Sequence, residues 1–229
     1  MDLQGYETLL MRGAAMTISL ALLSAAVAVM LGLCCALIRV FAADGFSRCI
    51  MVYTTVVRGI PDLALLLLIY YSLQGWINEI GDLLGWPGLV IDPFAAGVMT
   101  MGFIYGASFT ETFRGALIAI PPGQIEAARA IGLGQLRIFT RIIFPQMLTT
   151  ALPGITNNWL VLLKSTALVS VIGLQELVTY GGQAASATRQ PFFFMLVVGA
   201  IFLGFTAASQ LGLRWVSRRI DPSWTARHA

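Results

Sequence analysis

Residues 121–145 read PPGQIEAARAIGLGQLRIFTRIIFP and form the longest polar interruption in an otherwise apolar sequence. Pro121 and Pro122 cannot continue a helix that precedes them, and Gly123 frees the backbone beyond them. The chain therefore leaves one helix here and begins a different kind of structure.

The pattern inside this stretch predicts two short helices joined by a bend. Residues 124–131 have the spacing of an amphipathic helix, Gly132 and Gly134 provide the bend, and residues 135–144 form the second helix. Neither piece is long enough to cross a bilayer, which takes about 20 apolar residues. We predict a folded, positively charged loop at a membrane face, suited to docking a soluble partner.

Composition identifies the rest of the chain as a membrane protein. Of 229 residues, 58% are hydrophobic and 11% are charged, whereas a soluble domain carries about 25% charged residues. The length allows one domain, residues 1–229, and the apolar runs predict an all-α fold with about five transmembrane helices. The predicted spans are 13–38, 55–77, 94–120, 148–172 and 192–213.

The distribution of arginine predicts the orientation. With the N-terminus outside the cell, eleven arginines fall on the cytoplasmic side and only Arg12 and Arg189 fall outside. This is a strong positive-inside bias. It places the C-terminus and the loop 121–145 on the cytoplasmic side. The arginines are scattered and the net charge is only +3, which argues against nucleic acid as a partner.

The loop resembles the cytoplasmic EAA loop of permease subunits in bacterial ABC importers. In that family Glu-Ala-Ala is followed after three residues by Gly and after nine more by Ile-x-Leu-Pro. Every spacing matches here, and Phe144 replaces the usual Leu. The residues that the resemblance assigns to coupling with an ATPase are Glu126, Ala127, Ala128, Gly132, Ile142 and Pro145. It implies that both alanines let the loop sit close against its partner.

The resemblance extends over about residues 13–219. It is nearest to the type I importers of polar amino acids, in particular histidine, lysine, arginine and ornithine, or of the opines octopine and nopaline. Two further runs support it, Arg58-Gly59-Ile60-Pro61 and residues 102–115. It implies a bacterial inner (plasma) membrane location, a second similar permease as a hetero- or homodimer, two ATP-binding subunits on the cytoplasmic side and a periplasmic amino-acid-binding protein.

Polar residues inside the predicted spans are candidates for a translocation path or gate. Glu111 and Arg114 stand three apart near the cytoplasmic end of the third span, so they can form a structural ion pair or contribute to a gate. In the first span Ala28, Gly32 and Ala36 give a face of small residues. This face either suits close helix contact or reflects the general abundance of small residues in membrane helices.

The fourth span contains the only lysine of the chain, Lys164. A charge at membrane depth requires an interior or a water-filled location. Two interpretations stay open: Asn157, Lys164 and Thr166 line a translocation path, or Lys164 pairs with a carboxylate such as Glu111 of this or a partner subunit.

The sequence predicts no catalytic residue, no cofactor and no metal site in this chain. It has no GxxxxGK[ST] motif, and Cys34, Cys35 and Cys49 do not have the spacing of metal ligands. ATP hydrolysis is therefore expected in a partner subunit. The alternative is an ion-coupled secondary transporter or channel that works without an ATPase, which does not account for the EAA spacing. A more weakly supported third option is a membrane scaffold that transports nothing.

Overall fold

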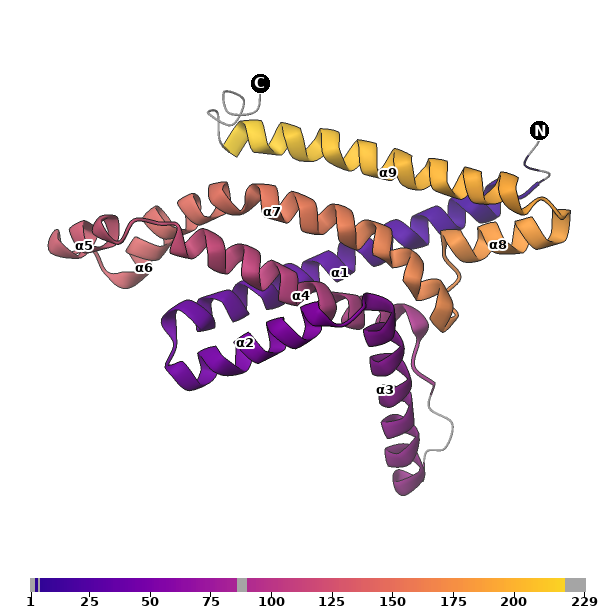
Figure 1. The fold of residues 1–229 in the computed structure, drawn as a ribbon, viewed down its shortest axis with the longest axis horizontal. Coiled ribbons are helices and arrows are strands. Elements are labelled where there is room, and N and C mark those ends of the chain that lie inside the picture. Colours follow the sequence, from indigo (N-terminus) through magenta and orange to yellow (C-terminus); the bar gives the residue numbers. More distant parts are fainter. Residues whose placement is uncertain (1–2, 4, 86–89, 221–229) are drawn as a thin grey trace.

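The computed structural model describes residues 3, 5–85 and 90–220, and every regular element in this part of the chain is helical (Figure 1). The elements in chain order are α1 (Glu7–Phe41), α2 (Asp44–Gly59), α3 (Asp62–Leu84), α4 (Pro93–Ile118), α5 (Pro122–Ala130), α6 (Gln135–Ile138), the π-helical turn η1 (Phe139–Ile143), α7 (Phe144–Ser165), the 3-10 helix η2 (Thr166–Ile172), α8 (Leu177–Thr188) and α9 (Pro191–Ile220).

The most extensive helix contact in the described part of the chain joins α1 and α4. It depends on glycines, because a methyl group added to Gly32 would lie 2.5 Å from Phe109 Cβ, and one added to Gly102 would lie 2.5 Å from Val27 Cγ1. Small residues let two helix backbones approach closely where no hydrophobic effect drives helices together. The buried positions of α1 include Ala28, Gly32 and Ala36, so the small-residue face is confirmed as a helix contact.

Four helical segments are long and apolar enough to cross a membrane: Glu7–Phe41, Asp62–Leu83, Gln135–Ile172 and Pro191–Arg219. The third predicted span, 94–120, forms α4, which has the required length but is not among these four. Its sequence is diluted by Gly, Thr and Ser, and most of its side chains are buried against other helices. Composition therefore does not mark α4 as a membrane-crossing helix, whereas its packing places it among the other helices of the bundle.

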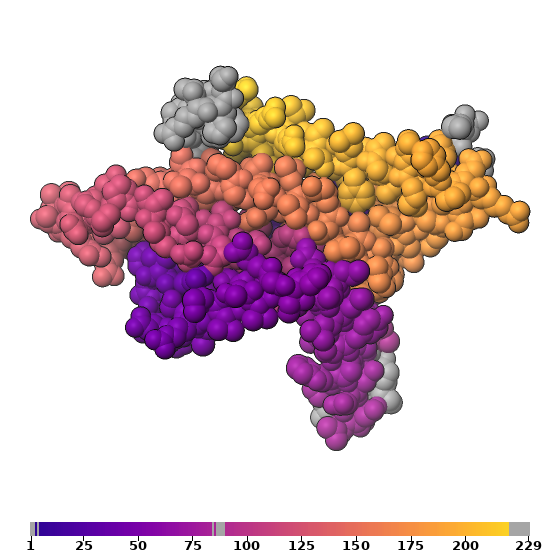
Figure 2. All heavy atoms as spheres, viewed as in Figure 1, coloured from indigo at the N-terminus to yellow at the C-terminus, as the bar shows by residue number. Residues whose placement is uncertain are grey.

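The predicted second span, 55–77, is divided in the structure. α2 ends at Gly59 and packs beside α1 and α4, while α3 begins after Pro61. Pro61 fixes its own φ and disfavours helical geometry at Ile60, which is extended with ψ 141°. The predicted bounds 55–77 therefore begin too early, since the helix of this span starts at Asp62, directly after Pro61, and α3 leaves the bundle as an arm (Figures 1 and 2).

The predicted second helix of the polar loop, 135–144, is not a separate piece. α6, η1, α7 and η2 follow one another without a gap from Gln135 to Ile172. Pro145 has no N–H to donate, and the preceding turn widens so that the Phe144 amide bonds to the Phe139 carbonyl five residues back. The π-helical turn accommodates Pro145, so the polar loop joins the fourth span as one helical path.

The region after η2 is also helical. α8 packs against α1 and α9, and its core is a second apolar cluster centred on Leu10, Leu177 and Phe194. α9 then runs back toward the end of the molecule that carries α5 (Figure 1).

Candidate functional site

The loop between α4 and α7 is a short helix closed by a glycine turn. Pro122 occupies the first turn of α5, where a missing N–H costs nothing. At the other end the Leu133 amide donates to the Ala128 carbonyl and the Gly132 amide donates to the Arg129 carbonyl, the bonding pattern of a Schellman cap. Gly132 has φ +78°, which favours glycine. The predicted short helix and its bend at Gly132 are confirmed.

The two alanines of the loop face in different directions. Glu126 and Ala127 are exposed, but Ala128 is only 4% exposed and lies in the main core. The prediction that both alanines face a partner is therefore wrong for Ala128, which holds α5 onto its own chain. Successive helix positions differ by about 100°, so neighbouring residues point to different sides.

The loop is also braced against α7. The Gln146 amide donates to Gln124 Oε1 at 2.7 Å and to the Ile142 carbonyl at 3.0 Å. Ile142 is half-buried and Pro145 is exposed. α5 lies at one tip of the molecule, far from the start of α1 (Figure 1). An exposed helix that is anchored at both ends can transmit a push or pull to α7.

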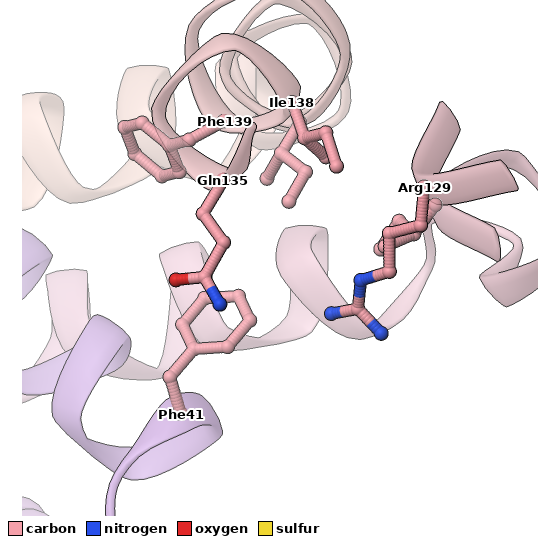
Figure 3. Close-up of a pocket in the computed structure, with 7 residues that line it drawn as sticks. Phe41, Arg129, Gln135, Ile138 and Phe139 are labelled. Carbon is pink, nitrogen blue, oxygen red and sulfur yellow. The ribbon is translucent and has the colours of Figure 1, made fainter. Parts of the chain in front are cut away.

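A cavity of about 340 Å³ separates this loop from the end of α1. Figure 3 shows Phe41, Gln135, Ile138 and Phe139 on one side of the opening and the Arg129 side chain extending toward it from the other. Ile125 and Ile143 complete the lining. The cavity is mainly apolar and has two polar groups at its edge.

Glu111 is the centre of a charge cluster that joins three helices. Its carboxylate forms ion pairs with Arg39 of α1 and with Arg114 one turn along α4, where Arg114 Nη2 lies 2.8 Å from Glu111 Oε2. The Thr54 hydroxyl of α2 donates to the same carboxylate at 3.0 Å. The predicted Glu111–Arg114 pair is confirmed, whereas Arg39 lies 72 residues away in sequence and was not predicted. A role in a gate stays a prediction.

A second polar network lies where two helices change direction. The Tyr105 hydroxyl of α4 donates to Asp62 Oδ2 at 2.7 Å and lies 2.6 Å from Ser165 Oγ. Asp62 is the first residue of α3, and Ser165 is the last residue of α7 before the 3-10 helix. Tyr105 therefore connects the α2–α3 break to the end of the helical path that starts at the loop.

The candidate path residues of the fourth span occupy two different environments. Asn157 and Lys164 are exposed on α7, together with Val161 at the intermediate turn. Thr166 is fully buried and its hydroxyl donates to the Leu163 carbonyl at 2.7 Å, which corrects the prediction that it lines a path. Among the described residues, Lys164 forms no ion pair with Glu111 or any other carboxylate.

Glu176 was not among the predicted site residues, although it is a fully buried acid. Its carboxylate caps α8 by accepting the Thr179 amide at 2.9 Å, and it accepts the Thr17 hydroxyl of α1 at 3.2 Å. Burial raises the pKa of this carboxyl, while hydrogen bonds from Val178, Thr179 and Thr17 oppose the rise. Glu is not among the residues preferred at a helix N-cap, which are Ser, Thr, Asp and Asn, so the sequence carried no strong signal for this cap.

Comparison with known proteins identifies the family. Residues 28–222 match the family described as "Binding-protein-dependent transport system inner membrane component". The chain belongs to this family. As a member it is a multi-pass inner-membrane transport component, consistent with its four apolar helical segments.

Relatives of this permease cover nearly its whole length. The histidine/lysine/arginine/ornithine transport system permease protein HisQ of Escherichia coli (strain K12) is 46% identical over 217 residues, which is 95% of each chain. The octopine transport system permease protein OccQ of Rhizobium radiobacter is 38% identical over 206 residues, 90% of this chain and 86% of that protein.

Solved structures share the fold of the permease. A chain of the crystal structure of an amino acid ABC transporter with histidines superposes with a TM-score of 0.81 at 30% identity, covering 96% of this chain and 99% of that chain. A chain of the inward-facing MetNI methionine ABC transporter gives a TM-score of 0.72 at 19% identity, covering 93% and 96%. The predicted all-α fold, like that of type I importers, is therefore confirmed.

Proposed function

We propose that this permease forms part of the translocation path of an ATP-driven importer of polar amino acids, in particular basic ones such as histidine, arginine, lysine and ornithine, or of opines. The substrate class follows from the relatives, whose names specify these solutes. The observation that carries the coupling mechanism is the exposed helix α5, held at a fixed angle by the Gly132 turn and by Gln146.

The machinery around the chain consists of a second similar permease, two ATP-binding subunits on the cytoplasmic side and a periplasmic amino-acid-binding protein. A separate ATPase is needed because the chain contains no phosphate-binding loop. In this arrangement α5 lies in the cytoplasm, the N-terminus lies outside, and the C-terminus lies on the same side as α5. The arginine distribution supports this orientation.

The coupling surface consists of Glu126 and Ala127 on the exposed side of α5. Movement of the ATPase would displace α5 and, through Gln146 and the unbroken helical path, the end of α7. There Ser165 meets Tyr105, which also holds Asp62 at the start of α3. A displacement of α7 would thus be transmitted through these contacts to the break between α2 and α3. Import requires only that two states of the ATPase favour two arrangements of these helices.

The translocation path lies along the exposed stripe of α7 that carries Asn157, Val161 and Lys164. Pro153 within α7 frees a backbone carbonyl, which is tolerated at membrane depth beside protein or a water-filled cavity. The second permease would close the other side of this path. Lys164 can attract the α-carboxylate of an amino acid there.

The test uses variants of the loop in the reconstituted complex with both permeases, the ATPase and the binding protein. Gly132→Val forces a β-branched residue to φ +78°, and Glu126→Lys reverses the charge of the coupling surface. Both variants should still insert into the membrane. In both, the amount of labelled arginine taken up per ATP hydrolysed should fall at least tenfold. The matched controls are Gly123→Val, a loop glycine without positive φ, and Glu79→Lys, an exposed acid of α3.

Two outcomes would contradict the proposal. One is wild-type coupling in both loop variants. The other is uptake driven by an ion gradient without ATP, which is the behaviour of a secondary transporter.

A further inference from the structure

The cavity between the end of α1 and the loop continues into a second hollow. The 340 Å³ cavity and an open hollow of about 440 Å³ share Phe41 and Phe139. The second hollow is otherwise lined by Leu37, Ile38 and Ala42. Together they form a groove, here called the α1–loop groove, that leads from Leu37 and Ile38 at the end of the predicted first span to Arg129 on α5. Figure 3 shows the part of this groove between Phe41 and Arg129.

The α1–loop groove is apolar at one end and polar at the other. The end beside Leu37 and Ile38 is hydrocarbon and lies where the first predicted span reaches the cytoplasmic face. The cavity nearer α5 presents the Arg129 guanidinium on one side and the Gln135 amide, next to Phe41, on the other. Ion pairs among the described residues form only at Glu111, so Arg129 has no acidic partner in this part of the chain.

We propose that the α1–loop groove binds an anionic phospholipid of the cytoplasmic leaflet. One acyl chain lies over Phe41 and Phe139, and the headgroup phosphate accepts hydrogen bonds from Arg129 and Gln135. Arg suits a phosphate because its planar guanidinium donates two parallel hydrogen bonds. Basic pockets between membrane helices on the cytoplasmic side are sites of this type.

Geometry favours a lipid over a protein in this groove. Residues 125 and 129 are four apart and line the same side of α5, whereas Ala127 is rotated by about 160–200° from them. A soluble ATPase that meets Ala127 therefore meets a different side of α5. The groove opens along α1 toward the bilayer, from which a lipid enters without leaving the membrane. The assignment to the cytoplasmic leaflet rests on the proposed orientation of the chain, but lipid binding does not depend on the proposed transport, so either can fail alone.

The experiment titrates the purified permease complex with phosphatidylglycerol or phosphatidylcholine of identical acyl chains and counts bound lipids by native mass spectrometry. The wild-type complex should bind phosphatidylglycerol several-fold more tightly than phosphatidylcholine. Arg129→Gln should weaken phosphatidylglycerol binding roughly fivefold, the effect of one arginine near an anionic surface. The matched control is Arg137→Gln, which removes the same charge from an exposed position of the same loop that does not line the groove.

The control separates a specific site from general attraction. Equal loss in Arg129→Gln and Arg137→Gln, or no preference in the wild type, would overturn the proposal. A photo-crosslinking residue at position 135 gives an independent answer. Adducts with phosphatidylglycerol in vesicles of phosphatidylglycerol and phosphatidylcholine support the lipid site, whereas adducts with the ATPase subunit would mean that the groove is a protein interface.

Discussion

α3 and α4 follow one another in the chain, yet they lie in opposite surroundings. α3 is apolar enough to be a candidate membrane span, but only 11% of the residues in its apolar 18-residue stretch are buried against the rest of the chain. α4 is not among the candidate spans, yet it is buried along most of its length. Figure 2 shows α3 standing clear of the rest of the molecule.

The difference follows from what each side chain contacts. α3 exposes large residues such as Leu68, Tyr71 and Trp76, which suit lipid or a partner protein. α4 carries Gly102 and Gly106 at one-turn spacing, and the Val27 and Leu31 side chains of α1 pack directly against them. In a membrane protein, the hydropathy of a helix indicates whether it can face lipid, while its small residues indicate where it packs against another helix.

The largest expected effect tests this contrast with one methyl group. In Gly32→Ala the new Cβ would lie 2.5 Å from Phe109 Cβ and 3.0 Å from the Phe109 carbonyl carbon, so α1 and α4 must separate. We expect a loss of roughly 3 kcal/mol of stability, the upper range for overpacking, measured as a lowered apparent Tm in detergent. Gly75→Ala on α3, where nothing lies within 4 Å, should leave the Tm unchanged or slightly raised. Equal effects at both glycines would remove the distinction between the helices.

A second pair of variants sharpens the contrast inside α3. Leu66 is fully buried in the second turn and Leu68 is 61% exposed. Leu66→Ala should cost about 2 kcal/mol, since a truncated core leucine leaves a cavity. Leu68→Ala should change the stability of the isolated chain by less than about 0.5 kcal/mol. Thermal unfolding of the purified chain measures both. If Leu68 faces the second permease, Leu68→Ala should also weaken co-purification of that subunit, a loss that Leu66→Ala would show only through unfolding.

The smallest expected effect concerns Glu176, which lies outside the four apolar segments and ties α8 to α1. Because burial raises its pKa above the ordinary value near 4.5, the folded chain binds this proton more tightly than the unfolded chain does. The stabilising contribution is fully present below about pH 4.5 and is lost as the pH rises through the pKa of the folded state. In Glu176→Gln the Tm should therefore decline less with rising pH than in the wild type. The control is Glu79→Gln, the same change at an exposed position of α3, and parallel pH profiles for all three chains would contradict the assignment.

Much of the fold was predictable because it depends on local composition. The apolar runs predicted the membrane class, and the polar stretch after Pro121 predicted the short helix that the structure shows as α5. The predictions failed at prolines. Pro61 splits the second span into α2 and α3, whereas Pro145 breaks nothing because a π-helical turn absorbs it. A proline removes a hydrogen bond in both places, and the surrounding helices decide whether the chain bends or widens.

Some features of the candidate site could be predicted from the sequence and others could not. The bend at Gly132 followed from its sequence context, since a helix end of this kind needs a residue that tolerates positive φ. The burial of Ala128 and Thr166 did not follow, because a shift of one residue rotates a side chain by about 100° about the helix axis and can exchange a surface position for a core position.

The sequence by itself determined that this chain enters a membrane and that a glycine-bent helix interrupts its apolar runs, and its arginines predicted an orientation. These properties follow from residue hydrophobicity, charge and backbone freedom within a few turns of helix. Tertiary structure alone decided that Arg39 meets Glu111, that Tyr105 joins Asp62 to Ser165, and that Thr17 reaches Glu176. These pairs lie 43 to 159 residues apart in sequence, and only the close approach of helices through small residues brings them within hydrogen-bonding distance.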